Sequence, residues 1–193
     1  MDNVRLKKET LSMNKLGNPG PLGLLGFGMT TILLNLHNAG LIPLSIVIIA
    51  MGVALGGFAQ IIAGILEFKN GNTFGGTAYT AYGFFWLSLV IIWTEGANYG
   101  GIDLTSMGYY LLLWGIFTLF MFIGSLKHNR LTQAIFFSLT VLFILLAVAD
   151  FTAIGWIKVI AGIVGIICGM LAMYSAVAQI VNLEHKKEIL PIK

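Results

Sequence analysis

Six long apolar stretches occupy most of this 193-residue chain, and they limit its fold more than any other feature. They cover about residues 22–39, 42–66, 76–94, 108–126, 132–149 and 155–183. A helix rises ~1.5 Å per residue, so the shortest stretches reach roughly 27 Å, close to the ~30 Å hydrocarbon core of a bilayer. None shows the sustained alternation that a membrane-spanning strand requires. The sequence therefore predicts an all-α integral membrane protein with six transmembrane helices in each protomer.

Charged side chains are scarce and unevenly placed. They make up 10% of the chain, against ~25% in soluble domains. Ten of the eleven basic residues fall on one side of the expected membrane, whereas the loops on the other side carry Glu95, Asp103 and Asp150. Because Lys and Arg collect on the cytoplasmic side, both termini are expected to be cytoplasmic. The expected parts are a cytoplasmic segment 1–17, a membrane domain 18–183 and a cytoplasmic tail 184–193.

The same features indicate where the protein works. The net charge of +3 follows from the membrane topology and does not indicate a nucleic-acid partner. No apolar signal-peptide core precedes the first stretch, and the single cysteine, Cys168, lies inside the last one. We therefore expect a multi-pass protein of the cell (inner or cytoplasmic) membrane, surrounded by lipid.

An unusual run opens the first apolar stretch and consists of Asn18, Pro19, Gly20, Pro21, Leu22, Gly23 and Leu24. Two prolines prevent a helix from continuing into it from upstream, and the asparagine can cap a helix that begins there. The last three amides of the run are then expected to lack partners within the helix, and such a positive helix end can hold an anion. The run can equally do no more than start a transmembrane helix, and both interpretations remain open.

The membrane interior offers little ionisable chemistry. Glu67, Asp150 and Lys158 lie near the ends of the stretches, and no carboxylate or histidine falls at mid-bilayer. A dedicated buried proton relay would need ionisable residues at that depth, where they are usually functional, so none is expected here. Any proton would move with the substrate or use the boundary groups. Among the neutral polar residues, Gln60 needs partners for its amide. It either lines a pore or braces the bundle.

Small residues recur at four-residue spacing in two of the stretches. Gly52 and Gly56 share this spacing, and so do Ala161, Gly165 and Gly169. Small faces let helices approach closely in lipid, either within one bundle or between subunits. The sequence does not contain the short motifs of metalloproteases, serine hydrolases or phosphate-binding loops, nor a Cys/His ligand cluster. We therefore expect no enzyme activity, no metal and no cofactor.

The opening run resembles the N-P-A-P-L-G-L signature of the acetate/succinate transporter family, with Gly20 where the signature usually has Ala. The likeness continues through residues 28–38, 67–74, 82–87, 136–140 and 190–192. The resemblance implies six-helix protomers that assemble as a homo-hexamer, each around its own narrow central pore for acetate, other small monocarboxylates or succinate. It also implies a hydrophobic constriction, and Phe27, Tyr82 and Leu139 match its Phe, Tyr and Leu.

Helix counting provides a check on that implied constriction. Phe27, Tyr82 and Leu139 lie five, six and seven residues beyond the starts of their stretches, which all run in the same direction. At ~1.5 Å per residue they reach similar depths of roughly 8–11 Å. Gln60 reaches about the same level from the end of the second stretch. The sequence therefore predicts that the three side chains can meet around one pathway.

Our hypothesis is a carboxylate pathway with polar ends and an apolar waist. The amides near Leu22 and the hydroxyl of Thr30 are expected to replace water around the carboxylate, and the Tyr82 hydroxyl is expected to add one polar contact. An anion channel and a proton-coupled symporter both remain open, as does the preference between acetate and succinate. Two other functions also remain: an aquaporin-like channel for small neutral solutes, and a membrane sensor or scaffold without transport.

Overall fold

The structure is a computed structural model and describes residues 17–192, which contain helices and no strand. The basic residues Arg5, Lys7, Lys8 and Lys15 of the predicted N-terminal segment, and Lys193, lie outside the described residues. The helices are α2 (Gly20–Asn38), α3 (Ile46–Met51), the π-helix η1 (Gly52–Ala59), α4 (Gln60–Lys69), α5 (Thr73–Glu95), the short 3-10 helix η2 (Gly96–Tyr99), α6 (Leu104–Ser125), α7 (Arg130–Thr152) and α8 (Gly155–His185). One helical segment thus coincides with each predicted apolar stretch.

Five segments of the described chain are long and apolar enough to cross a membrane, and they run from Ile46 to Lys69 and through α5, α6, α7 and α8. The prediction of an all-helical, multi-pass membrane protein is therefore confirmed at that level. The remaining helix, α2, contains glycine, threonine, asparagine and histidine among its apolar residues. It packs against α8, η1, α4 and α5, so much of its surface faces other helices and has no need to be apolar.

Three turns use the same device to begin a helix. Asn72, Asp103 and Asn129 each accept a hydrogen bond from the backbone N–H three residues later, at 3.0, 2.7 and 2.8 Å. These bonds satisfy amides that have no partner inside the helix, which is why α5, α6 and α7 begin where they do. Hydrogen bonds from Ser106 lower the pKa of the exposed Asp103 carboxyl below its usual value.

The small residues of α8 are used inside the protomer. A Cβ on Gly169 would lie 2.7 Å from the carbonyl oxygen of Gly28 in α2, and one on Gly165 would overlap the side-chain amide of Asn35. The two helix backbones therefore approach so closely that only glycine fits. Of the two roles that the sequence left open for this small face, packing within the bundle is the one observed.

The second apolar stretch is not a regular α-helix. Residues Gly52–Ala59 form a π-helix between α3 and α4, a local form that is often found at functional sites. A Cβ on Gly56, within this turn, would lie 2.8 Å from the ring of Trp86 in α5 and 2.9 Å from Thr30 in α2. The missing side chain thus lets three segments meet at one point near the middle of the bundle.

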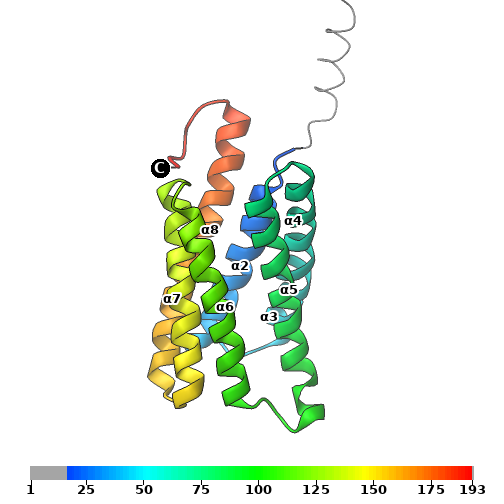
Figure 1. Cartoon of the computed structure of the whole chain (residues 1–193), viewed down its shortest axis with the longest axis vertical. Coiled ribbons are helices and arrows are strands. Elements are labelled where there is room, and N and C mark those ends of the chain that lie inside the picture. The colour runs from blue at the N-terminus through cyan, green and yellow to red at the C-terminus, as the bar shows by residue number, and fades with distance from the viewer. Residues whose placement is uncertain (1–16, 193) are drawn as a thin grey trace, which may run out of the picture.

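The helices form one bundle whose two described chain ends lie at the same end (Figure 1). In this view α4 and α5 lie on one side of α2, while α6, α7 and α8 lie on the other. The end that holds both chain ends also carries Lys69, the α6–α7 turn and the tail after α8. This arrangement agrees with the uneven charge pattern of the sequence. It positions the faces of α2, α4, α5 and α7 to surround a cavity.

Candidate functional site

A cavity of about 430 Å³ opens at the end of the bundle that holds the chain ends. Its walls come from every long segment except α6, together with the tail. The lining residues are Asn18, Gly20, Leu24, Phe27, Gln60, Glu67, Asn72, Phe74, Gly75, Ala78, Tyr79, Tyr82, His128, Asn129, Thr132, Ile135, Phe136, Leu139, Gln179 and Ile192. Except for Gln60, the amide and charged side chains of the lining lie at or near the helix ends, whereas Phe27, Tyr82 and Leu139 lie farther along the helices.

The three residues of the predicted constriction line this same cavity. Phe27, Tyr82 and Leu139 come from α2, α5 and α7, and their exposed fractions are 6%, 3% and 3%. The rings of Phe27 and Tyr82 lie 6.0 Å apart between centroids. They lie seven to nine residues from the helix ends at the mouth, or roughly 10–14 Å at 1.5 Å per residue. The structure therefore brings the three side chains together at similar depth, and their role as a constriction stays a prediction.

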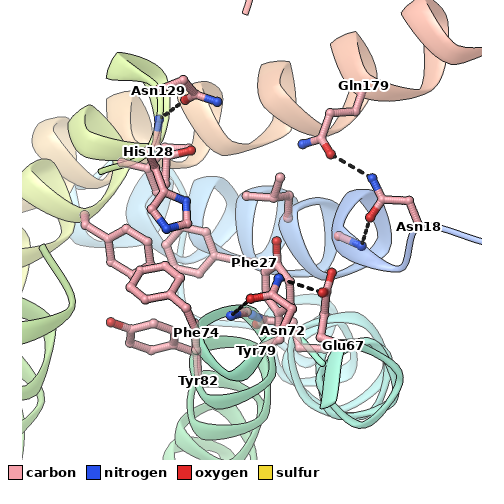
Figure 2. A pocket seen from close by; sticks show the side chains of 18 of the residues that line it. Asn18, Phe27, Glu67, Asn72, Phe74, Tyr79, Tyr82, His128, Asn129 and Gln179 are labelled. Carbon is pink, nitrogen blue, oxygen red and sulfur yellow. Dashed lines mark hydrogen bonds between the residues drawn. The ribbon is translucent and has the colours of Figure 1, made fainter. Parts of the chain in front are cut away.

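The hydroxyl of Tyr82 does not extend into the cavity as a free polar group. It lies 2.9 Å from the Thr118 hydroxyl of α6, which itself donates to the Trp114 carbonyl at 2.7 Å. Figure 2 shows the Tyr82 hydroxyl pointing away from Asn18 and Glu67. Because Thr118 has one hydrogen and gives it to Trp114, Tyr82 is the donor in the shared bond. The polar contact of Tyr82 with a substrate therefore stays a prediction, and Tyr82 can make it only by accepting a hydrogen bond on its oxygen.

Gln60 lines the cavity, but Thr30 does not. Both are fully buried, and neither side chain has a hydrogen-bond partner among the described residues. An unpartnered buried amide costs free energy, and a bound polar molecule would reduce that cost. For Gln60 this favours the pore-lining role over the brace, because a brace would bond to a neighbouring helix. Thr30 lies instead beside Gly56 and Trp86.

The opening run starts α2, but not as an open cradle of amides. Asn18 accepts a hydrogen bond from the Gly20 N–H at 3.0 Å, and the Leu22 and Gly23 N–H groups donate to the Pro19 carbonyl at 3.1 and 3.2 Å. The expectation that these amides lack partners is therefore wrong, since the chain turns tightly enough for Pro19 to accept them. Leu22 is 40% exposed and faces outward.

Members of the run differ in their relation to the cavity. Asn18, Gly20 and Leu24 line it, whereas Pro19 and Pro21 are buried without lining it. Gly23 lies against the ring of Tyr79, because a Cβ there would lie 2.6 Å from ring atoms. The run therefore shapes the entrance through its backbone path and through the side chain of Asn18.

A polar cluster surrounds the mouth (Figure 2). The side-chain amide of Asn18 donates to Gln179 of α8 at 3.1 Å, and that of Asn72 donates to Glu67 at 2.7 Å. Glu67 is 6% exposed, although it ends an apolar stretch. His128 lies opposite these residues in Figure 2, with its ring 4.7 Å from that of Phe74.

Sequence reasoning had not placed Glu67, Asn72, His128, Gln179 or the tail residue Ile192 in the site. One signal was available: Asn72 precedes a helix, five residues after Glu67, where a capping side chain is expected to turn back. No sequence pattern indicated that α8 and the tail reach the same opening. His128, in the turn between α6 and α7, also lines the mouth.

Comparison with known proteins assigns the chain to a family. A model of the GPR1/FUN34/yaaH family matches residues 3–191. The chain belongs to this family. Its GPR1/FUN34/yaaH relatives include the succinate-acetate/proton symporter SatP of Escherichia coli (strain K12), 54% identical over 181 residues that cover 92% of this chain and 96% of that protein. The expected resemblance to acetate/succinate transporters is confirmed.

Other members of the GPR1/FUN34/yaaH family extend the comparison. A solved structure of the bacterial acetate channel SatP matches with a TM-score of 0.90 and 53% identity, covering 93% of this chain and 100% of that one. Ammonia transport outward protein 2 of Saccharomyces cerevisiae is 36% identical over 184 residues, which cover 90% of this chain and 64% of that protein. These relatives are transport proteins, so the prediction that the chain is not an enzyme is confirmed.

Proposed function

We propose that this protein carries acetate and related small carboxylates, including succinate, across the membrane through a pore inside each protomer. The observation that carries this proposal is the cavity with a polar mouth and with Phe27, Tyr82 and Leu139 at similar depth on three helices. A small acid with one polar end and one methyl group suits such a passage. The similarity to SatP supports the same substrate class.

Within this pathway we assign roles to the predicted residues. Asn18, Gly20 and Leu24 form part of the entrance, and the rest of the opening run holds the backbone there. Gln60 offers an amide to the carboxylate near the waist, while Thr30 packs from α2 beside Gly56, one turn before Gln60. Phe27, Tyr82 and Leu139 exclude hydrated ions by size and by dewetting.

Radiolabelled acetate uptake into proteoliposomes tests the function. We expect uptake above protein-free liposomes, with competition by succinate, lactate and formate. Water flux in the same liposomes is expected to stay at the lipid background, which distinguishes this function from an aquaporin-like channel. Binding of acetate without any protein-dependent flux would contradict transport and favour a sensor.

We further propose that α2 crosses the membrane with the five more apolar segments, that both termini are cytoplasmic, and that the protein is a homo-hexamer in the cell membrane. The shared end of the described chain ends and the charge pattern support the first two points. The hexamer follows from the family resemblance. Light scattering of the detergent-solubilised protein, corrected for bound detergent, is expected to give six times the mass of one chain.

A further inference from the structure

We propose that Glu67 is the proton-carrying group of this pathway, taking up a proton at the mouth and passing it to the entering carboxylate. The proposal rests on the proposed transport function and adds to it a residue that couples substrate and proton. It concerns the one buried carboxylate that lines the cavity among the described residues.

The α4–α5 turn holds Glu67 in one orientation. Its Oε2 accepts a hydrogen bond from the Asn72 side-chain amide at 2.7 Å, and its backbone carbonyl accepts from the Asn72 N–H at 2.9 Å. Asn72 in turn accepts from the Gly75 N–H and so caps α5. A carboxylate fixed in this way to a helix start is a positioned group, and it points into the mouth (Figure 2).

The second oxygen of Glu67 is available to a ligand. No donor among the described residues bonds Oε1, which lies beside Gly20 at the start of α2. A Cβ on Gly20 would lie 3.3 Å from this oxygen, so the glycine keeps the adjacent space open. Asn18, just before α2, and Gln179 of α8 face the same region, and both are neutral.

Charge around the cavity makes a proton necessary. Among the described residues, the lining contains neither Lys nor Arg, and its other titratable groups are Tyr79, Tyr82 and the exposed His128. Lys69, two residues after Glu67, is also exposed. A substrate carboxylate would thus meet Glu67 without a lining Lys or Arg to offset the two like charges, and paired carboxylates in a confined site share a proton. Substrate binding and protonation of Glu67 are therefore linked, each favouring the other.

The proposed step is balanced in charge and atoms. Oε1 accepts a proton from a hydronium ion at the mouth, which leaves neutral water, and the new O–H donates a hydrogen bond to the entering carboxylate. The proton then passes across this bond: the O–H bond of Glu67 breaks, one forms on the substrate, and Glu67 returns to a carboxylate. The substrate continues as a neutral acid, which loses less solvation than an anion on passing Phe27, Tyr82 and Leu139. The same steps run in reverse.

The test compares Glu67→Gln with Glu95→Gln in proteoliposomes that carry an acetate gradient at equal pH on both sides. Gln at 67 keeps a donor at the mouth but cannot release a proton. Glu95 is a matched control, because it also accepts an Asn side-chain amide, at 2.9 Å from Asn98, and lies outside the cavity. A potential-sensitive dye is the readout, since acetic acid that leaks through lipid carries no net charge.

We expect the wild type and Glu95→Gln to move acetate with little change of potential, because proton and anion cross together. Glu67→Gln is expected to shift the membrane potential toward the acetate equilibrium potential, because the anion then crosses without a proton. Equal small potentials in all three proteins, with acetate uptake retained, would overturn the role of Glu67 but not the transport function. A wild type that develops the full potential also overturns the role. Absence of labelled acetate uptake by the wild type overturns the transport function itself.

A second measurement decides the case of a Glu67→Gln protein that is folded but inactive. Acetate binding to the detergent-solubilised protein is followed by calorimetry in buffers of different ionisation enthalpy. The wild type is expected to take up about one proton per acetate, and Glu67→Gln close to none. Equal proton uptake by the two proteins would overturn the proposal.

Discussion

The hydrogen-bond state of Tyr82 shows how one residue can set what the waist accepts. Its hydroxyl donates to Thr118, so its oxygen can only accept a further hydrogen bond. An undissociated acid has an O–H to give, whereas a carboxylate does not. The aromatic ring, together with Phe27 and Leu139, sets the width of the passage. The width of the passage and its hydrogen bond to the substrate therefore depend on different parts of Tyr82, the ring and the hydroxyl, and can be changed separately.

Truncation of Leu139 tests the size part. We expect Leu139→Ala to raise lactate uptake relative to acetate by roughly 10-fold or more, since a methylene-sized change in an apolar pocket changes selection by about 10- to 200-fold. Phe27→Ala is expected to act in the same direction. Competition of labelled acetate uptake by a series of monocarboxylates measures the effect.

Tyr82→Phe is the matched control for these two variants. It keeps the ring and removes the hydroxyl, so the size selection is expected to stay within about twofold of the wild type while the protein loses about 1 kcal/mol of stability with the Thr118 bond. A wild-type selection pattern in both alanine variants would refute the assignment of the constriction.

At the scale of helices, the contact of α2 with α8 depends on two facing backbones. Neither the Gly28 carbonyl nor the α2 backbone near Ile32 can move aside like a flexible side chain. The cavity wall that Phe27 and Leu24 provide is therefore tied to the position of α8. A change in the α2–α8 distance would move the constriction as well.

We expect Gly169→Ala to destabilise the protein by about 1–3 kcal/mol, because the added methyl group must separate the two helices. Gly155→Ala is the control, since a Cβ at Gly155, in the first turn of α8, has no neighbouring atom within 4 Å. It is expected to be neutral or to stabilise by up to about 1 kcal/mol. Thermal unfolding of the detergent-solubilised protein compares them, and equal midpoints would contradict the close backbone contact.

The tail after α8 is held to that helix mainly by the side chain of Asn182, and the Tyr174 hydroxyl adds a hydrogen bond to the Pro191 carbonyl at 3.0 Å. The Asn182 side chain accepts hydrogen bonds from the Ile189 and Leu190 N–H groups at 2.7 and 2.9 Å and donates to the Leu190 carbonyl at 2.7 Å. We expect Asn182→Ala to speed hydrogen exchange at these two amides about tenfold. Asn182→Asp keeps the accepting oxygen and should exchange nearly as slowly as the wild type. Unchanged exchange in the alanine variant would mean that other contacts hold the tail.

For the whole molecule, the decisive property is which end of the bundle faces the cytoplasm. The end that carries Lys69 at the end of α4, Lys127 in the α6–α7 turn and the tail after α8 is expected to be cytoplasmic. The native Cys168 is fully buried and should react little, so single cysteines can report sidedness. Glu188→Cys is expected to react with an impermeant maleimide only in inverted vesicles, and Tyr99→Cys only in intact cells. The reverse pattern would place the mouth of the cavity on the outer side of the membrane and contradict the proposed topology.

Much of the fold could be predicted because helices in lipid must be apolar and about 20 residues long. Counting along the helices also placed Phe27, Tyr82 and Leu139 at one depth. The amide partners of Leu22 and Gly23 could not be predicted, because they depend on how tightly Pro19 turns. Convergence of Glu67 with Gln179 could not be predicted either, since it depends on the faces that α4 and α8 turn toward each other, and only tertiary packing decides that.

The position of Ile192 at the edge of the cavity has a practical consequence for anyone who purifies this protein. An affinity tag or fluorescent fusion joined directly after Lys193 would begin within two residues of the entrance. Its bulk or its histidines would then stand in the path of incoming solute. Transport rates measured with such a fusion would be those of a protein with a blocked entrance, unless the fusion is first removed by a protease.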